Sequence, residues 1–561
     1  MARWDVIVVG SGFGAAVMAA RIGQALQGTG KTVLLLEKGP DPTGALDLDN
    51  PAGEPGGLPL NAQGNRFRHT YEPGYLGGVG ELFTDPDGAF RPGRPSLTIA
   101  AGRGLGGGSN LYCGVSLRCP SASFDQIRGG RRLWPVRYTR AALDPYYARV
   151  EAALRVHRLA WTDREAPHWQ LATRRDWAFA EGCRRIGATA VPLKLADDAD
   201  ANEGWWTEGQ RFAGRQDLTG NYLADAAAAG VVLASGCEVD AIAPDGPDYA
   251  VSGTDRRSGS DVRFDHVCRL LVLGAGAVGS TGLLLRNQGA FQGERVLDLG
   301  GDAGDAPNLG RHLSANGDYG VTGLVGEAFA RPLHGERGKP MASFSPSWWR
   351  DHRFIVIAFH APPLFLALNR FTTLLSPRNP AAVGRGSTTA ALGPDGRPQR
   401  DWGAGYVDTL TRFSERVLTM GCLALDACEG EVSLGPAGTV SVAWPRTASE
   451  TEARWSEALT QMRRIYEALD GELLLDGYRG EGTVHTAHPL GGARMAEDPL
   501  DGVVDPNGEA WGNPNLFVVD GAILPSALGV NPSLTIAAVA EAIADRLVDG
   551  IGMPSLLARL A

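Results

Sequence analysis

Short runs of consecutive apolar residues, each followed by glycine or an acidic residue, open the chain. Residues 6–9 and Val33–Leu36 are apolar at every position, which is typical of parallel strands buried on both faces. Residues 15–26, which lie between these runs, have a helical composition. The pattern therefore predicts a strand–helix–strand unit with a tight turn over residues 10–14.

The glycines of this turn suit a phosphate group. Gly10 permits the turn, Gly12 lets a pyrophosphate approach the backbone, and Ala15 keeps the helix close to the sheet. The free N–H groups at the helix N-terminus attract the anion. Glu37, at the end of the second strand, can accept hydrogen bonds from ribose hydroxyls and would repel a 2′-phosphate. The segment therefore favours FAD or NAD over NADP, and the alternative is a glycine-rich turn without a ligand.

A second glycine-rich segment lies at residues 102–114. Five of the seven residues from 102 to 108 are glycine, which excludes a stable helix or strand interior there. Such a run is typical of backbone that must lie flat on a large group, and a planar cofactor is a candidate. A flexible loop is the alternative that the residues leave open.

The C-terminal region also combines a strand, a turn and a helix. Residues 516–519 predict a buried strand, with Asp520 and Gly521 as the turn at its carboxyl end. Asn531 and Pro532 predict the start of the last helix, the first as N-cap and the second as the first helical residue. A helix N-terminus carries partial positive charge, which would stabilise an electron-rich flavin placed against it.

The size and charge of the chain narrow the possible functions. A chain of 561 residues is too long for one ordinary hydrophobic core, so we expect two or more domains. With 43% hydrophobic and 21% charged residues, the composition excludes a disordered or fibrous protein. The net charge of −10 argues against nucleic acid or an anionic membrane surface as the principal partner.

Cysteines and apolar segments give expectations about the compartment. Seven cysteines without a C-x-x-C pair favour reduced thiols over disulfides or a zinc site, which fits a cytoplasmic protein. The first strand begins at Val6, which leaves no room for an export signal. No run of about 18 apolar residues predicts a membrane-spanning helix. We therefore expect a protein without stable membrane insertion and without a bound metal.

Seven ordered segments together resemble the glucose-methanol-choline (GMC) family of FAD-dependent oxidoreductases, and within it the cholesterol oxidase-like branch. The first three are the turn at residues 10–16, the glycine run at residues 102–110 and the C-terminal HPLGG, DG and GVNPSLT motifs. The other four lie at residues 134–154, 218–226, 273–287 and 308–318. The stretch from about residue 331 to residue 418 takes no part in the resemblance.

The resemblance implies an α/β fold with two domains. One is a discontinuous, Rossmann-like FAD-binding domain formed by residues 1–120, 218–318 and 482–561. The other is an α+β substrate-binding domain with a large mixed or antiparallel sheet, formed by residues 121–217 and 319–481.

The resemblance also assigns site residues by position. His488 matches the active-site histidine of the family, and Asn531 matches the asparagine of the cholesterol oxidase-like branch. Val239 would meet the adenine of FAD through its backbone. The other residues that would contact FAD, from its ADP half to its ring, are Gly10, Gly12, Phe13, Gly14, Glu37, Arg103, Gly107, Gly108, Ser109, Asn110, Asp520, Gly521 and Pro532.

The chain departs from the family pattern beside the predicted flavin ring. Tyr112, Cys113 and Gly114 stand where many relatives have Asn-Gly-Gly, and Asn110 lies two residues earlier. Leu111 falls near the position where some relatives attach FAD through histidine, which implies noncovalent FAD. Residues 354–363 hold no glutamate of the kind that some sterol oxidases use for isomerisation, so steroid isomerase activity is not expected.

His488 is the residue type that alcohol oxidation needs. The reaction removes a hydroxyl proton while a hydride leaves the same carbon for flavin N5, and a neutral imidazole is well matched to take that proton. Asn531 can donate its amide to the substrate oxygen or the flavin edge and so fix a near-attack geometry. The alternative for His488 is an ordinary buried histidine. We interpret His485 and His360 as structural or secondary.

Several aromatic residues have two possible interpretations. They could line an apolar substrate pocket, or they could be an ordinary mixture of core and surface residues. Because aromatic residues make up only 7% of the chain and are not enriched, we favour the second interpretation. The residues concerned are Trp205, Trp206, Trp348, Trp349, Phe359, Phe365 and Phe371.

The sequence thus predicts an FAD-dependent alcohol oxidase or dehydrogenase that acts on the CH–OH group of an apolar, sterol-like or long-chain substrate. Its partners would be that small-molecule alcohol and oxygen or another electron acceptor. Three alternatives stay open: a flavin-dependent lyase such as a fatty-acid photodecarboxylase on the same fold, a flavin-binding scaffold without catalysis, and an NAD dehydrogenase.

Overall fold

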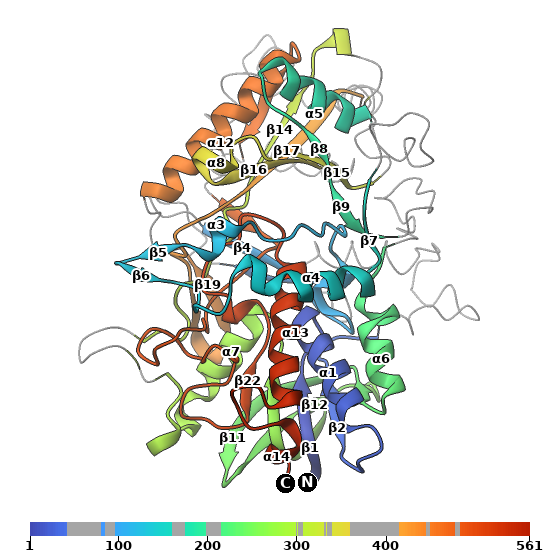
Figure 1. Ribbon diagram of the computed structural model, residues 1–561, viewed down its shortest axis with the longest axis vertical. Helices are drawn as coiled ribbons and strands as arrows, with labels where there is room; N and C mark the ends of the chain where they lie inside the picture. Colours follow the sequence, from blue (N-terminus) through green and yellow to red (C-terminus); the bar gives the residue numbers. More distant parts are fainter. Residues whose placement is uncertain are drawn as a thin grey trace.

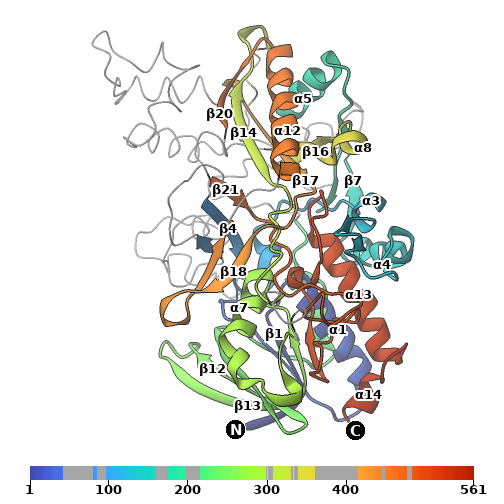
Figure 2. The ribbon, with the colours of Figure 1, turned by 90° about the vertical axis from the view of Figure 1, so that its left-hand side faces the viewer.

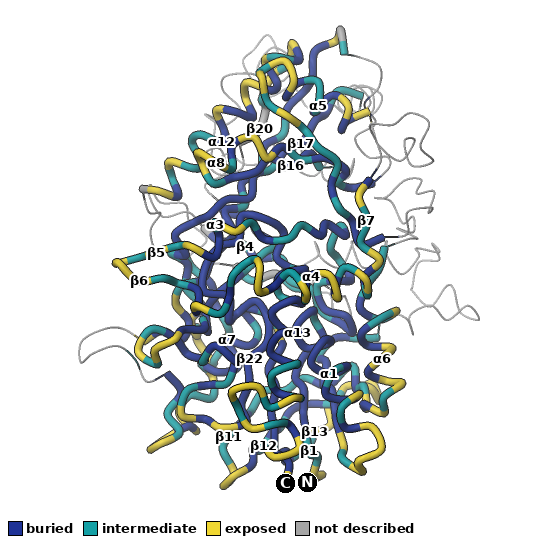
Figure 3. Tube along the Cα trace, viewed as in Figure 1, coloured by how far each residue is buried: buried dark blue, intermediate teal, exposed yellow. Residues whose placement is uncertain are grey.

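The two largest sheets of the described residues lie one above the other along the long axis of the molecule (Figure 1). The part that holds both termini contains β1 and α13, and the other part contains α12 and the strands β14 to β17. Buried residues run through both parts (Figure 3). This computed structural model describes residues 1–41, 80–84, 96–159, 174–197, 215–298, 300, 307–329, 333, 339–359, 415–444, 449–476 and 483–561.

A seven-stranded sheet forms the part with the termini. Its central strand β1 (Ala2–Val9) is parallel to both neighbours, β2 (Val33–Leu36) and β13 (Val262–Leu273). The first half of β13 pairs with an antiparallel strand and its last residues pair with a parallel one. The other strands are β10 (Val232–Ala234), β11 (Cys237–Asp245), β12 (Asp248–Asp255) and β22 (Leu516–Val518).

The strand–helix–strand unit predicted from the apolar runs is confirmed. Residues 6–9 lie in β1, Val33–Leu36 is β2, and all eight residues are buried, as expected for strands covered on both faces. The helix α1 (Phe13–Leu26) begins two residues earlier than predicted. It packs beside α6 (Tyr222–Ala228) and α13 (Ser533–Asp549), and Figure 2 shows α1 and α13 together on one side of the sheet.

The parallel strands of this sheet end in one row. Val9 pairs with Leu36 on one side and with Leu273 on the other, and Leu273 pairs with Val518. The residues that follow these four strands therefore meet at one edge of the sheet. The carboxyl edge of parallel strands is where α/β folds bind their ligands.

A six-stranded antiparallel sheet forms the other part. It agrees with the large mixed or antiparallel sheet that the family resemblance predicted. The helices α5 (Arg174–Arg185) and α12 (Ser449–Ala468) pack on it and on each other. In spatial order its strands are β20 (Glu472–Asp476), β14 (Tyr319–Leu324), β17 (Val417–Ala424), β16 (Phe354–Phe359), β15 (Met341–Ser345) and β8 (Val191–Pro192).

A small three-stranded sheet brings the C-terminal segment to the second glycine run. Its strands are β3 (Gly80–Thr84), β4 (Ser96–Gly102) and β21 (Thr483–Thr486), and β21 runs parallel to β4. His488 follows β21, and the glycines that follow Gly102 come after β4. Two segments almost 400 residues apart in sequence are thereby held at one place.

The division of the chain into two domains stays a prediction. Every strand of the seven-stranded sheet comes from the three ranges assigned to the FAD-binding domain, and every strand of the six-stranded sheet comes from the other two. The helix α4 (Arg140–Ala153), although assigned to the substrate-binding domain, packs on α13.

All seven cysteines are unpaired, as predicted for reduced thiols. Among the described residues, no helix has both the length and the apolar character needed to cross a membrane. Shorter elements complete the described fold: α3 (Ser121–Phe124), β5 (Ile127–Arg128), β6 (Arg131–Arg132), β7 (Val156–Arg158), β9 (Lys194–Ala196), α7 (Ala277–Asn287), α8 (Trp349–His352), β18 (Glu431–Leu434), β19 (Val440–Ala443) and α14 (Leu556–Arg559).

Candidate functional site

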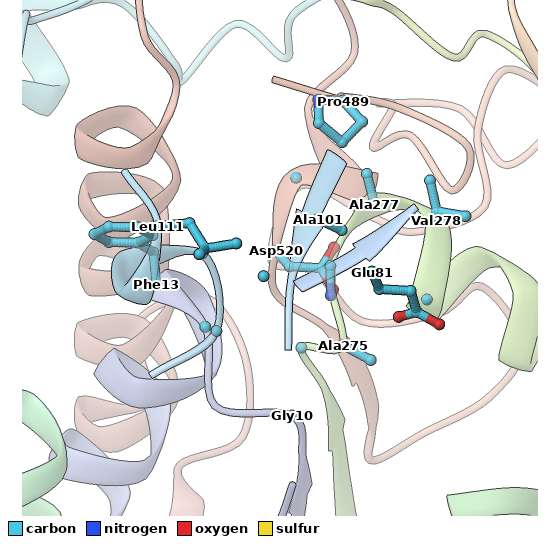
Figure 4. Close-up of a pocket in the computed structure, with 18 of the residues that line it drawn as sticks. Gly10, Phe13, Glu81, Ala101, Leu111, Ala275, Ala277, Val278, Pro489 and Asp520 are labelled. Carbon is cyan, nitrogen blue, oxygen red and sulfur yellow. The ribbon is translucent and has the colours of Figure 1, made fainter. Parts of the chain in front are cut away.

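A cavity of about 760 Å³ begins at the carboxyl edge of the seven-stranded sheet. Figure 4 shows Phe13 and Leu111 on one side, Ala277, Val278 and Glu81 on the other, and Asp520 between them. The cavity continues to His488 and Asn531, so one continuous space joins the predicted cofactor turn and the predicted catalytic residues. This size is typical of small-molecule and cofactor sites.

The turn after β1 closes this edge through backbone contacts. Gly10 has φ +94°, and a Cβ there would lie 2.3 Å from the carbonyl oxygen of Gly274. A Cβ at Gly14 would lie 1.8 Å from the carbonyl oxygen of Val519, so only glycine lets α1 approach the strand β22 this closely. At Gly12, by contrast, a Cβ would meet no atom within 4 Å. Gly12 therefore leaves open space that a ligand can fill.

Glu37 ties the turn after β1 to the second glycine run. Its Oε2 accepts a 2.6 Å hydrogen bond from Ser11 Oγ, and its Oε1 accepts from the backbone N–H groups of Gly39 and Gly104. Burial raises the pKa of this carboxyl, while the three donors oppose the shift. Glu37 also lines the cavity, where it can accept hydrogen bonds from a bound molecule.

Asp520 occupies the corresponding position at the end of β22. Its carboxylate accepts hydrogen bonds from Ser280 Oγ at 2.5 Å and from the backbone N–H groups of Ala522 and Gly276. Burial raises the pKa of Asp520 to about 6. These bonds fasten the turn before α7 to the turn after β22, with Gly276, Ala277 and Gly521 all lining the cavity.

The second glycine run contributes backbone rather than side chains. Gly107 and Gly108 line the cavity, and a Cβ at Gly107 would lie 2.8 Å from the Cα of Gly12. The side chain of Ser109 points into the protein, where its Oγ donates to the carbonyl of Gly106 and accepts from the N–H of Leu218. The run is thus packed against the first turn.

His488 lies at the far end of the cavity, with its two ring nitrogens in different environments. Nδ1 is 2.8 Å from Asp318 Oδ2 and 3.0 Å from Oδ1. Nε2 is 3.1 Å from the amide nitrogen of Asn531. The imidazole side chain is 21% exposed, and the cavity is where it meets open space. This position at the cavity wall keeps the active-site assignment of His488 as a prediction.

The last helix begins one residue later than predicted. Pro532 is the N-cap of α13, and the helix starts at Ser533. The prediction that Asn531 is the N-cap is therefore wrong, because its side chain turns to His488 instead. Its Oδ1 is buried and has no hydrogen-bond partner among the described residues. An orphaned acceptor at the cavity wall is a group that a ligand can satisfy.

The lining of the cavity includes the end of the six-stranded sheet. Phe359 and Met341, which pair across β16 and β15, line the cavity together with Thr419 of β17. The ring of Phe359 lies beside Gly421, whose Cβ would be 3.1 Å from its Cε1. Trp348 belongs to the core and stacks on Phe354. For this residue the structure agrees with our interpretation of the aromatic residues as an ordinary mixture of core and surface. Trp205, Trp206, His360, Phe365 and Phe371 lie outside the described residues.

Most of the residues predicted from the sequence converge on this cavity. His488 and Asn531 lie at one end, and His485 is exposed on β21. Arg103, Ser109 and Asn110 are not among the described residues that line it, and their predicted contacts with the cofactor stay predictions. The predicted residues that do line it are Gly10, Gly12, Phe13, Gly14, Glu37, Gly107, Gly108, Val239, Asp520, Gly521, Pro532, His488 and Asn531.

Two polar residues of the site were missed by the sequence analysis. Asp318 contacts the imidazole, and Thr486 donates to Asp318 Oδ2 at 2.7 Å. Asp318 is the last residue of one of the segments that carry the family resemblance. Its distance in sequence from His488 gave no indication that the two side chains are partners. Asp318 and His488 are 170 positions apart, and only the folded chain brings them together.

The residues present fit a flavin dinucleotide. The open space beside Gly12 and Gly108 admits a group against the backbone. The N-cap of α1 is Gly12, which has no side chain to cap the first N–H groups of the helix. Such uncapped N–H groups bind phosphate. Glu37 supplies the acceptor for ribose, and the far end of the cavity supplies the imidazole.

The chain matches two GMC oxidoreductase family models, one over residues 5–314 and the other over residues 433–540. It is 26% identical to a long-chain-alcohol oxidase of Arabidopsis thaliana, across 98% of this chain and 68% of that protein. It is 51% identical to a cholesterol oxidase of Mycobacterium tuberculosis over 81 residues, 14% of each chain.

Solved structures share the fold. Pyridoxine 4-oxidase from Mesorbium loti superposes with a TM-score of 0.62 at 18% identity, covering 97% of this chain and 99% of the other. A fungal aryl-alcohol oxidase superposes with a TM-score of 0.58 at 16% identity, covering 98% and 99%. Since the first family model alone spans more than half of the residues, the chain belongs to the GMC oxidoreductase family of FAD-dependent enzymes.

Proposed function

We propose that this enzyme oxidises the CH–OH group of an apolar, sterol-like or long-chain alcohol to a carbonyl, with His488 as the base. The observation that carries the proposal is the position of the imidazole. Nε2 lies 3.1 Å from the Asn531 amide, at the wall of the cavity that also holds the dinucleotide turn. FAD, when bound, supplies the acceptor for the hydride.

The protein side chains divide the remaining work. Because Nδ1 of His488 is held by Asp318, Nε2 is the nitrogen that receives the hydroxyl proton. Asn531 fixes the substrate oxygen by donating its amide N–H to it, which leaves the lone pair of Nε2 free to accept the hydroxyl proton. The carbon then loses its hydride, and the C–O bond becomes a carbonyl. Proton and hydride together account for the two hydrogens that the alcohol gives up.

The lining and the relatives support an apolar substrate. Phe359 and Met341 form part of the apolar lining of the cavity that His488 also lines. Similar proteins bear the names long-chain-alcohol oxidase and cholesterol oxidase. Oxygen is accordingly the acceptor that we propose for the second half of the reaction.

We propose that FAD is held without a covalent bond. Leu111, near the position where some relatives carry the attaching histidine, lines the cavity and has no nucleophilic atom. Burial raises the pKa of Cys113, a thiol of the same wall, to about 11, so it stays protonated and unreactive at neutral pH. Acid precipitation should leave all of the yellow cofactor in the supernatant. The unpaired thiols also support the proposal of a cytoplasmic location.

Anaerobic mixing tests the function. The purified holoenzyme is mixed with straight-chain primary alcohols from octanol to hexadecanol and with cholesterol, and the flavin absorption band is followed. We expect at least one alcohol to bleach the band and yield its carbonyl. His488→Ala should keep FAD and lose the bleaching by about 10²-fold or more, as expected for loss of a positioned base.

Two results would contradict parts of this proposal. Release of hydrocarbon from a fatty acid under blue light, without bleaching by any alcohol, would support the lyase. Unchanged bleaching in the His488→Ala variant would remove the base assignment.

A further inference from the structure

A chain of four polar groups runs from β21 to the start of α13. Thr486 Oγ lies 2.7 Å from Asp318 Oδ2, which lies 2.8 Å from His488 Nδ1. His488 Nε2 in turn lies 3.1 Å from Asn531 Nδ2. The carboxylate side chain is 14% exposed, so the Asp318–His488 pair is largely withdrawn from water. Hydrogen bonds of this kind are stronger and more directional than those on an open surface.

The hydrogen bonds assign the imidazole proton. An ionised carboxylate can only accept, so Nδ1 of His488 must carry the hydrogen that it donates to Asp318. Nε2 of the neutral ring is then left with its lone pair. That lone pair accepts from the N–H of Asn531, and both residues line the cavity. The partner of one nitrogen therefore fixes the chemistry of the other.

Thr486 fixes the carboxylate against the ring. Its Oγ accepts a 2.8 Å hydrogen bond from the backbone N–H of His488 and donates to Asp318. One hydroxyl thereby holds both members of the pair. A substitution of Thr486 that keeps the hydroxyl but changes the rest of the side chain should therefore preserve both hydrogen bonds.

The backbone on both sides of the pair is also held. Ser314 and Leu490 exchange two backbone hydrogen bonds, of 2.7 and 3.1 Å. Asp426 accepts from the N–H of Gly317, directly before Asp318. The segments that carry Asp318 and His488 are thus joined independently of the Asp318–His488 hydrogen bond, so removing the carboxylate should leave the ring in place.

We propose that Asp318, oriented by Thr486, is a positioning residue that fixes His488 in the tautomer with hydrogen on Nδ1. The base nitrogen Nε2 then faces the substrate, and the carboxylate offsets the positive charge of the ring after it has taken the hydroxyl proton. The inference rests on the proposed function, since it concerns the base of that reaction.

The tautomer can be read directly in the holoenzyme without any substrate. Histidine labelled with ¹⁵N in the chain, which has ten histidines, gives separate signals for protonated and unprotonated ring nitrogens. The His488 signals are those missing from the His488→Ala variant. We expect the wild type to carry hydrogen on Nδ1. Asp318→Leu, of similar size but without an acceptor, should move the hydrogen to Nε2.

The rate of flavin bleaching with the best alcohol of the panel should follow the tautomer. Asp318→Leu should slow bleaching by about 10²-fold, and Asp318→Asn, which keeps an acceptor for Nδ1 but no charge, by about 10-fold. Thr486→Ser is the matched control for Thr486→Val. The serine variant should keep the wild-type rate, and the valine variant should lose about 10-fold.

The outcomes separate this inference from the proposed function. If His488→Ala abolishes bleaching while Asp318→Leu keeps both the Nδ1 hydrogen and the rate, the positioning role is wrong and the base assignment survives. If His488→Ala bleaches normally, the proposed function fails, and the ¹⁵N signals still decide whether Asp318 sets the tautomer. A wild-type signal with hydrogen on Nε2 would overturn the inference outright.

Discussion

The two ends of the cavity are built in opposite ways. At the dinucleotide end, strands and turns approach each other where side chains are missing, as Gly14 does against Val519 and Gly107 against Gly12. At the other end, the side chains of His488, Asp318 and Asn531 meet from separate segments and leave one acceptor unpartnered. The dinucleotide end is formed by the packing of the backbone itself, whereas the other end is formed by polar side chains that the packed segments carry.

This difference predicts different consequences of substitution. A substitution that adds atoms at the dinucleotide end should affect folding or cofactor retention, because the closely packed backbone segments cannot move apart without cost. A change at the hydroxyl end should alter the rate while the folded protein still holds FAD. The following substitutions test this contrast, beginning with the largest expected effect.

Gly14→Ala should prevent accumulation of folded holoenzyme. The added Cβ would lie 1.8 Å from the Val519 carbonyl oxygen, so α1 or β22 must move, at a cost of about 3 kcal/mol or more in unfolding free energy. Soluble yield and the melting temperature measure this effect. Gly12→Ala is the control, since its Cβ enters open space: the apoprotein should melt as the wild type does but bind FAD more weakly. Equal melting temperatures for the wild type and Gly14→Ala would contradict the packing argument.

Asp520→Asn should remove a pH dependence of the apoprotein. Because burial raises the pKa of Asp520 from 3.8 to about 6, the folded state binds this proton more tightly than the unfolded state. The group's contribution to stability is therefore highest below about pH 4 and falls by about 3 kcal/mol as pH rises through 6. Measured by urea unfolding, the stability of the wild type relative to the variant should fall by this amount between these pH values. Parallel profiles would show that Asp520 does not carry the effect.

Asn531→Ala should slow flavin bleaching by about 10- to 10²-fold while FAD stays bound. The variant removes the amide that contacts Nε2 and the unpartnered Oδ1, but it leaves Pro532 to begin α13. Stopped-flow absorbance measures the rate, and the flavin-to-protein absorbance ratio measures retention. Loss of FAD with an unchanged rate per flavin would place Asn531 in the cofactor site instead.

Phe359→Ala should change substrate preference by a few-fold. The ring lies at the end of β16 beside Gly421 and lines the cavity, so its removal widens the cavity. The ratio of kcat/KM for cholesterol to that for hexadecanol should rise, because a hydrophobic wall discriminates by shape and contact area. Trp348→Phe, in the core away from the cavity, should leave the ratio unchanged. If both variants give the wild-type ratio, Phe359 does not shape the substrate site.

The sequence predicted the dinucleotide end far better than the hydroxyl end. Val33–Leu36 is β2 as predicted, and Asp520 follows β22 at the edge where the turn was expected. At the other end, His488 and Asn531 came from family resemblance, Asp318 and Thr486 were missed, and Asn531 was assigned to a helix cap that it does not form. The apolar runs report burial of neighbouring residues, but they carry no information about partners on distant segments.

The amino-acid sequence by itself predicted the strands β1, β2 and β22, the first helix and the turns that follow β1 and β22, because apolar runs and glycines act through local backbone conformation and burial. Only the tertiary structure decided which carboxylate faces the imidazole. Asp318 and His488 are 170 residues apart, and their contact depends on how three sheets and their connecting segments pack. A pairing that is set by packing leaves no spacing in the sequence from which it can be read.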